Sequence, residues 1–290
     1  MTQRNNEDRI GAVDQQVDNP VEAIATQAPE GAAFSFATPT EFVGLPSGGR
    51  YYPTDHPLHN VATVEIKHMT AKDEDILTSR TLLKQGIAID RLLKNVIVDK
   101  SINIDDMLVG DKNSILVTTR ATGYGTQYNT TVLCPVCGTS NDHAFDLGTG
   151  LVNSGGSESA EPGTVVEEDN GTFSIDLPQS KVTTTVRLMT GRDEKNIAKL
   201  AEQKKKHNLG DSSLTDQLRM IIVAVNGTND RSAIHNFVEN MPAIDSRYLR
   251  SIYAKITPNV DLSQEFACNT CDYSGDMEVP FTADFFWPQR

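Results

Sequence analysis

Four cysteines, arranged as two closely spaced pairs, are the residues of this chain best suited to chemistry. Cys134 and Cys137 form one pair and Cys268 and Cys271 the other, each with two residues between its cysteines. That spacing lets both thiolates of a pair face one metal ion, about 2.3 Å away in the case of zinc. Because one pair supplies two ligands and a structural zinc ion takes four, we predict one structural Zn²⁺ site built by both pairs.

Two other interpretations of the cysteines stay open, namely thiols without metal and a thiol-disulfide redox site. Reactive Cys-x-x-Cys pairs lie at a helix N-terminus after a strand, and neither pair has that context. The first ten residues show no apolar segment of a secretory signal, so we expect a reducing compartment that disfavours disulfides. His143 could replace a cysteine ligand, but its counterpart near the second pair is Met277, which favours a solvated strand histidine.

Motifs of the common enzyme classes are missing from the sequence. It contains no His-Glu-x-x-His, no Walker loop and no Gly-x-Ser-x-Gly. The carboxylate pair at Asp105 and Asp106 fits a helix start, and the basic cluster at 204–207 fits a helix end. We therefore predict no enzymatic activity, no catalytic residues and no small-molecule substrate.

Charge and hydropathy limit the classes of partner. Lys and Arg number 26 against 39 Asp and Glu, which gives a net charge of -13. A nucleic-acid or anionic-membrane binder needs basic surface to displace counterions, so both classes are disfavoured. The longest apolar run, residues 220–225, is far shorter than the roughly 18 residues of a membrane span.

Much of the negative charge lies in two stretches that are poor in large apolar residues. Residues 1–40 are predicted to form a flexible acidic arm, and residues 148–175, rich in Gly and Ser, a flexible linker. Two folded parts, 41–147 and 176–290, remain on either side of this linker.

The two folded parts repeat the same motifs in the same order. The equivalent segments are 69–74 with 189–194, 90–97 with 216–223, Asp111 with Asp245, and the first cysteine pair with the second. Such ordered matches predict an internal duplication. Two copies packed about a pseudo-two-fold axis would bring the cysteine pairs together, so that the metal joins both halves.

Each copy is predicted to contain a strand, three helices and a hairpin that carries the cysteines. Thr70 and Thr190 are expected N-caps, each with an aspartate three residues later. The expected strands are 62–68 and 181–188, the apolar helices run through 92–97 and 218–225 with a stop at Gly227, the third helices are 111–119 and 246–256, and the hairpin strands are 128–133, 143–147, 265–267 and 277–281. The predicted class is α+β, with helices dominant.

Two segments rich in aromatic residues are candidates for binding a partner protein. Their apolar anchors are Phe42, Leu45, Tyr51, Tyr52, Phe285, Phe286 and Trp287. One interpretation is that both segments cover the chain's own core, as docked termini often do. The other is that they anchor in a neighbouring protein, because aromatic side chains make good hot spots.

Several of these motifs together resemble a known family. They are the segment 42–53, the element at 69–74, Arg120 with Tyr124 and Gly125, and the closing Phe-Phe-Trp-Pro at 285–288. From about residue 40 to the end, the chain is similar to the baseplate hub proteins of T-even-type bacteriophages. The resemblance implies a hub component or a hub-assembly factor of a contractile tail, with other baseplate and hub proteins as partners. It also implies a place in the host cytoplasm during assembly, or in the baseplate of the virion tail.

A zinc-ribbon adaptor that binds nucleic acid or a polymerase is the alternative from another class, and a Cys-x-x-Cys thiol-disulfide enzyme is the third. The adaptor predicts Lys and Arg around the cysteines. Glu265, Asp272, Asp276 and Glu278 surround the second pair instead, which disfavours the adaptor.

Overall fold

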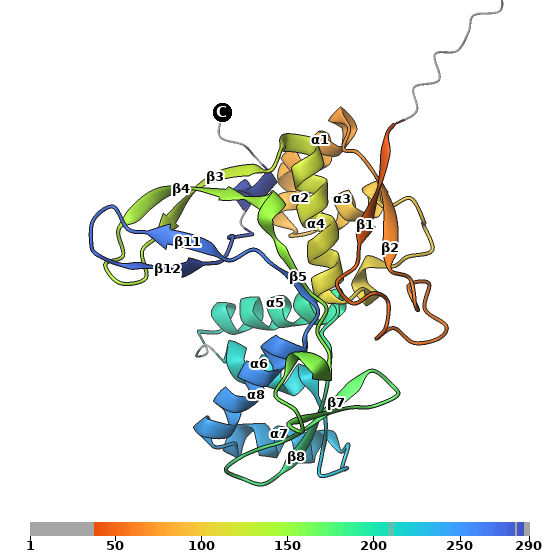
Figure 1. Cartoon of the computed structure of the whole chain (residues 1–290), viewed down its shortest axis with the longest axis vertical. Helices are drawn as coiled ribbons and strands as arrows, with labels where there is room; N and C mark the ends of the chain where they lie inside the picture. Colours follow the sequence, from red (N-terminus) through yellow and green to blue (C-terminus); the bar gives the residue numbers. More distant parts are fainter. Residues whose placement is uncertain (1–37, 209, 211, 282, 287–290) are drawn as a thin grey trace, which may run out of the picture. The chain divides into compact units, whose positions relative to one another are not determined.

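The computed structural model describes residues 38–208, 210, 212–281 and 283–286 (Figure 1). Residues 1–37, which make up nearly all of the predicted acidic arm, lie outside the described residues, as does Trp287. The described residues form a mixed α+β fold with several small sheets, as the sequence predicts. Among them are twelve strands, eight α-helices and four short 3-10 helices (labelled η), and the expected dominance of helices is not confirmed.

The first part of the chain begins with two paired strands, continues with helices and ends in a hairpin. Its elements are β1 (Thr40–Gly44), β2 (Thr63–Lys67), α1 (Ala71–Thr78), α2 (Arg80–Lys84), α3 (Ala88–Val96), η1 (Ile104–Asp106), α4 (Val109–Tyr124), β3 (Gln127–Leu133) and β4 (Ser140–Asp146). The strand pairs β1–β2 and β3–β4 are both antiparallel. The strand, helix and hairpin positions predicted for this part agree with β2, α3, α4, β3 and β4 to within a few residues.

The second part contains a four-stranded sheet, four α-helices, three short 3-10 helices and a second hairpin. Its elements are η2 (Leu147–Thr149), β5 (Leu151–Asn153), η3 (Ser157–Ser159), β6 (Val165–Glu167), β7 (Thr172–Asp176), β8 (Thr183–Arg187), α5 (Gly191–Lys206), α6 (Ser213–Ile221), β9 (Ile222–Val225), α7 (Arg231–Asn240), α8 (Ala243–Ile256), β10 (Asn259–Asp261), β11 (Gln264–Ala267), β12 (Ser274–Met277) and η4 (Ala283–Phe286). The order in the larger sheet is β6-β7-β8-β9, and β10 pairs with β5.

Residues 148–175 differ from the flexible linker that their composition predicts. They contribute β5, β6 and most of β7, and β5 pairs with β10 from the far end of the chain. Val165 and Phe173 are buried in the core. A few apolar residues at alternating positions are enough to fix these strands once β8 and β10 offer free edges, and averaged composition does not detect such positions.

The helix predicted through residues 218–225 is wrong beyond Ile221. α6 ends there, and residues 222–225 form β9, which pairs with β8 with Ile222 opposite Val186. The segment is β-branched and apolar, so it suits the open edge of a sheet as well as it suits a helix. The chain after α3 also turns from helix to strand-like pairing, since Ile97 forms an isolated bridge with Ile66 of β2.

Both predicted N-caps are confirmed. Thr70 begins α1 and Thr190 begins α5, each in a reciprocal capping box with the aspartate three residues later. The backbone N–H of each threonine donates to that aspartate at 2.9 Å. Asp73 and Asp193 are buried, and each contacts a further polar side chain, Asn95 or Arg187 respectively. The boxes fix how each helix leaves the strand before it.

Two fully buried aspartates, each in the first turn of a helix, tie loops to helices. Asp111 lies in the first turn of α4 and accepts hydrogen bonds from the backbone N–H of Ser47 at 3.0 Å and from its hydroxyl at 2.6 Å. Asp245 lies in the first turn of α8 and accepts from the backbone N–H groups of Gln179 and Ser180, both at 2.8 Å. The loop after β1 and the loop after β7 are therefore held by the same device.

Replacing Asp245 with asparagine should destabilise the fold by about 2 kcal/mol, because an amide cannot accept both backbone N–H groups. Burial alone would raise the pKa of Asp245, but the hydrogen bonds from Gln179 and Ser180 outweigh it and lower that pKa. The ionised carboxylate therefore adds stability above its unfolded-state pKa of about 4, and this stability is lost as pH falls through the lower folded-state value. Urea unfolding of the wild type and Asp245→Asn at pH 7 and pH 3 measures the difference.

Asp111→Asn is the matched control. Burial outweighs the hydrogen bonds from Ser47 and Tyr52 and raises the pKa of Asp111. The pH dependence of its contribution to stability therefore has the opposite sign. That contribution is complete below the unfolded-state pKa and declines as pH rises through the folded-state value. Relative to the wild type, Asp245→Asn should therefore be less destabilised at pH 3 than at pH 7. Asp111→Asn should not show this decrease. Equal acid dependence in both variants would contradict the assignment.

Helices α4 and α5 join the two parts of the chain at their N-terminal ends. The backbone N–H of Val109 donates to the carbonyl of Met189 at 3.0 Å, and that of Gly191 donates to the carbonyl of Met107 at 2.9 Å. Ion pairs across the same junction, which we call the α4–α5 junction, are Lys112–Glu194, Lys195–Asp90, Lys195–Asp105 and Arg192–Asp106. This contact does not depend on the cysteines.

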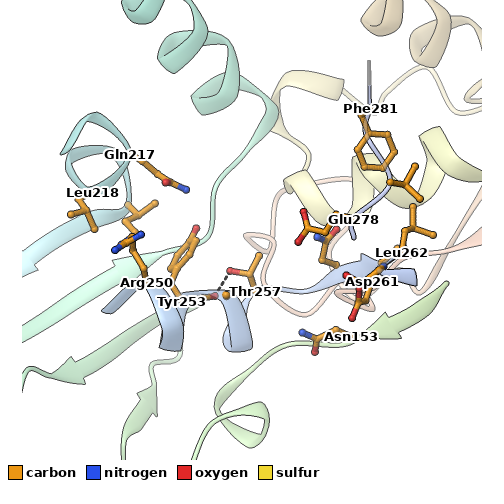
Figure 2. Close-up of a pocket in the computed structure, with 16 residues that line it drawn as sticks. Asn153, Gln217, Leu218, Arg250, Tyr253, Thr257, Asp261, Leu262, Glu278 and Phe281 are labelled. Atoms are coloured by element: carbon orange, nitrogen blue, oxygen red, sulfur yellow. Dashed lines mark hydrogen bonds between the residues drawn. The ribbon is translucent and has the colours of Figure 1, made fainter. Parts of the chain in front are cut away.

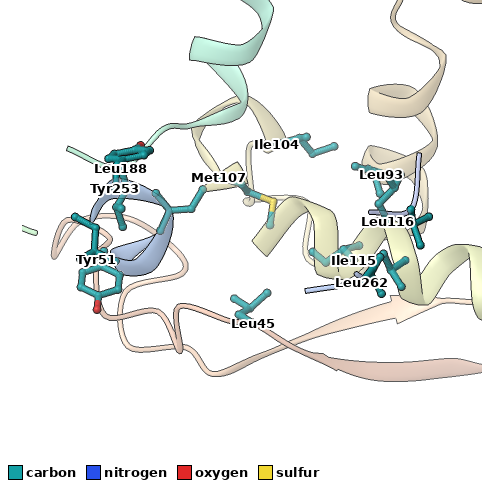
Figure 3. Close-up of a cluster of buried hydrophobic side chains, with 14 of the residues drawn as sticks. Leu45, Tyr51, Leu93, Ile104, Met107, Ile115, Leu116, Leu188, Tyr253 and Leu262 are labelled. Carbon is teal, nitrogen blue, oxygen red and sulfur yellow. The ribbon is translucent and has the colours of Figure 1, made fainter. Parts of the chain in front are cut away.

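One hydrophobic core runs through both parts of the chain. Figure 3 shows Met107 with Leu188 and Tyr253 on one side and Ile115 on the other. The backbones also approach closely, since a Cβ on Gly110 would lie 1.8 Å from the carbonyl oxygen of residue 258. The first hairpin, which follows α4, and the second, which follows α8 and β10, thus start from one shared core.

Candidate metal centre

The two cysteine pairs lie in the turns of hairpins β3–β4 and β11–β12, which adjoin in Figure 1. Cys134 follows β3, and its backbone N–H donates to the carbonyl of Thr139 at 2.9 Å. Cys268 follows β11, and its N–H donates to the carbonyl of Tyr273 at the same distance. Gly138, with φ at 69°, completes the first turn. The two turns have the same closing bond, so they present their thiols alike.

All four thiol sulfurs meet between the hairpins. Cys134 Sγ lies 3.7 Å from Cys271 Sγ, and Cys137 Sγ lies 3.7 Å from Cys268 Sγ. The four sulfurs all lie within 4.8 Å of one another. A tetrahedral zinc ion with bonds of about 2.3 Å places its sulfurs about 3.8 Å apart, whereas a disulfide needs about 2.05 Å. The predicted four-cysteine cluster is therefore present, it holds no disulfide, and its dimensions fit a tetrahedral metal ion.

Hydrogen-bond donors around Cys268 favour its thiolate form. The backbone N–H of Thr270 donates to Cys268 Sγ at 3.3 Å, and the side-chain amide of Asn141 lies 3.7 Å from the same sulfur. Asn141 in turn accepts from the backbone N–H of Asn269 at 2.8 Å, which ties one hairpin to the other. Such outer contacts fix the direction of a metal ligand.

Without a cation the pKa values of Cys268 and Cys271 shift in opposite directions. The N–H of Thr270 lowers the pKa of Cys268 to about 6. The N–H of Tyr273 acts on Cys271 in the same sense, but desolvation and the three neighbouring thiols outweigh it and raise the pKa of Cys271 to about 12. A divalent cation would remove this repulsion, because metal-bound cysteines are thiolates.

His143 is not part of the cluster. Its ring packs edge-on against Phe145 and Phe266, with centroids 4.5 Å and 5.6 Å away. Phe266 belongs to β11 and is fully buried, so this contact forms the small core between the hairpins. His143 lies in β4 and outside the cluster, as expected, but the expectation that it is solvated is wrong, because its Nε2 is buried and has no hydrogen-bond partner among the described residues.

Arg120, near the end of α4, holds the C-terminal segment against the base of the hairpins. It is 1% exposed, and its guanidinium donates to the carbonyls of Phe285 at 2.7 Å, Gly125 at 2.8 Å and Gln127 at 3.3 Å. It also lies over the ring of Tyr124, 5.3 Å from the centroid. The sequence marks Arg120 as part of the family resemblance but does not indicate these contacts, although a charged residue at the end of an apolar helix was a usable signal.

Most of the predicted partner-binding residues are buried in this chain. Leu45, Tyr51, Tyr52, Phe285 and Phe286 belong to the hydrophobic core. Phe42 is 68% exposed. This placement favours the interpretation that both segments cover the chain's own core, and partner binding by these residues stays a prediction.

None of the helices in the described part of the chain has both the length and the apolar character needed to cross a membrane. The residues that the sequence indicates as candidates fall into two groups. The four cysteines lie together in one cluster, whereas most of the aromatic anchors are buried in the core.

A family model described as T4 bacteriophage base plate protein matches residues 39–287. The match includes both hairpins, the α4–α5 junction and the C-terminal aromatic segment. No curated protein and no solved structure matches the chain.

Proposed function

The chain belongs to the T4 bacteriophage base plate protein family, and we propose that it is a non-enzymatic structural or assembly protein of a contractile tail baseplate. Its role would be that of a hub component or of a factor that assists hub assembly. The match over residues 39–287 carries this proposal, because it spans nearly every residue that the structure describes. Other baseplate and hub proteins are then its partners, in the host cytoplasm and in the virion tail.

The cofactor of this proposal is one structural zinc ion held by Cys134, Cys137, Cys268 and Cys271. The distances between the sulfurs support it, together with the soft all-thiolate ligand set, which suits zinc. A closed set of four protein ligands leaves no open position for a substrate, so the ion would have a structural role. When bound, zinc would hold both hairpin turns together.

We attribute the arrangement to a duplication of one strand–helix–hairpin unit, with copies at 41–147 and 176–290. The strand pairs before the capped helices support this, because the antiparallel pair β1–β2 precedes α1 and the antiparallel pair β7–β8 precedes α5. Most of β7 (Thr172–Asp176) lies ahead of the bound at residue 176, so the second unit would begin earlier than its sequence predicts. The capping boxes and the buried pair Asp111 and Asp245 support it as well.

The nucleic-acid adaptor remains the alternative. Acidic residues around the hairpins argue against it, since a phosphate backbone requires cations. A thiol-disulfide enzyme would need a pair of cysteines that reacts in the folded, metal-loaded chain.

Deleting the gene from the phage and supplying the chain from a plasmid tests the role. Normal infectious tails without the chain would contradict the proposal, and tails that assemble only when it is supplied would support it.

Measuring zinc per chain together with native mass tests the proposed metal centre. One zinc per monomer would support a site within one chain. Zinc found only in a dimer would mean that the cysteine pairs of two chains share the ion, and no zinc would contradict the proposed zinc site.

A further inference from the structure

A groove lies between the helices of the second part and the strands that lead to the cysteines. Its volume is about 560 Å³, within the range of about 300–1,000 Å³ typical of binding sites. Figure 2 shows one wall with Gln217, Leu218, Arg250 and Tyr253, from α6 and α8, and the other wall with Asp261, Leu262, Glu278 and Phe281, from β10 and the chain around and after β12.

The groove is apolar at its base and carries an exposed aromatic ring at one end. Leu218, Ile221, Leu262 and Val279 line it from buried positions. Phe281 is 46% exposed, and this aromatic ring stands at the groove beside charged side chains. An apolar channel with an exposed aromatic residue is typical of a surface that receives side chains of another protein.

The charges of the groove indicate what it receives. Asp261 and Glu278 lie on the hairpin side, and neither forms an ion pair with any residue that the structure describes. Arg250, on the opposite wall, is the only Lys or Arg among the described residues that line the groove. The sequence contains no Lys or Arg at 121–180 or 256–286, so the hairpins carry no cation of their own.

The exposed face of β11–β12 continues the acidic wall. Glu265 lies directly opposite Asp276 in the strand pair, and both are exposed. Like charges directly opposite each other destabilise a strand pair. Glu278 lies two residues after Asp276 and is exposed as well, as the alternation of side chains along a strand predicts. A partner with basic side chains would relieve the repulsion that the chain does not relieve itself.

We propose that the groove and the exposed face of β11–β12 bind a Lys- or Arg-bearing segment of another baseplate protein, with apolar side chains inserted beside Phe281. The inference rests on the proposed baseplate function and names the chemistry of the partner. A second copy of this chain is disfavoured as the occupant, because copies with a net charge of -13 repel each other.

The first test uses the full zinc-loaded chain and two fluorescein-labelled peptides of equal length, one alternating Leu with Lys and the other Leu with Glu. Fluorescence anisotropy should show binding of the Lys peptide alone. The variant Asp261→Lys with Glu278→Lys should weaken that binding at least about tenfold. The matched control, Glu161→Lys with Asp169→Lys, makes the same charge change at exposed positions outside the groove. Equal weakening by both double variants would overturn the proposal, since only net charge would then matter.

The second test asks whether each double variant restores tails in the gene-deleted phage. We expect the control to restore them and the groove variant to fail, with zinc content and thermal unfolding unchanged in both. Full restoration by the groove variant would overturn the docking site and leave the baseplate function intact. Normal tails without any chain would contradict the baseplate function itself. Self-association of the wild type that the groove variant abolishes would assign the groove to a second copy and also overturn the proposal.

Discussion

Replacing Cys268 with serine is expected to remove the metal and to release the two hairpins from each other. The variant keeps three thiolates, and the sulfur 3.7 Å from Cys137 is lost. Serine is a poor ligand for zinc, so bound zinc per chain should fall at least about tenfold. Metal analysis of the purified chain measures the loss. Hydrogen exchange should quicken across 127–146 and 264–277, whereas the α4–α5 junction should stay protected, because its ion pairs do not involve the cysteines.

Cys268→His is the matched control, because imidazole is a zinc ligand and serine is not. It should keep more metal and more hairpin protection than Cys268→Ser. If Cys268→Ser retained its zinc and the exchange protection of both hairpins, the four-cysteine centre would be refuted. If it lost zinc but both hairpins remained protected, the metal would not be what holds the hairpins together.

Arg120→Ala should be the most destabilising change outside the cysteine cluster, by about 3 kcal/mol or more. It leaves the carbonyls of Phe285, Gly125 and Gln127 without their donor and opens a cavity in the core. The C-terminal aromatic segment should then detach from α4. Urea unfolding measures the stability, and limited carboxypeptidase digestion measures how readily the end of the chain is released.

Arg120→Lys separates the charge from the geometry of this contact. A lysine keeps the charge but cannot reach three carbonyls with a planar fork of donors, so we expect only partial rescue. Full stability in the lysine variant would show that charge alone matters. Wild-type stability in Arg120→Ala would show that the three hydrogen bonds contribute nothing.

The cysteine cluster could be predicted because two kinds of sequence information agreed. The spacing gave pairs of ligands, and the order of repeated motifs gave a reason for distant pairs to meet. The N-caps Thr70 and Thr190 were equally predictable, because a capping box is a local interaction that needs no distant partner.

The errors lie where a distant segment decides the local structure. Residues 222–225 form β9 because β8 offers an edge, and residues 151–153 form β5 because β10 does. Neither edge is visible in the residues themselves, and tertiary context overrides weak local preference. The contacts of Arg120 were hidden for the same reason, since Phe285 approaches from the other end of the sequence.

The two halves of the metal centre are made at different times. Cys134 and Cys137 leave the ribosome well before Cys268 and Cys271, so a growing chain carries an incomplete ligand set until its last segment has been synthesised. An ion bound by all four cysteines would close a loop of more than half of the described chain, and such a long closure lowers the entropy of the unfolded state most. A chain truncated before the second hairpin would lack Cys268 and Cys271, and it would also lack the carbonyl of Phe285 that Arg120 contacts. Zinc retention would therefore distinguish finished from unfinished copies before they reach a growing baseplate.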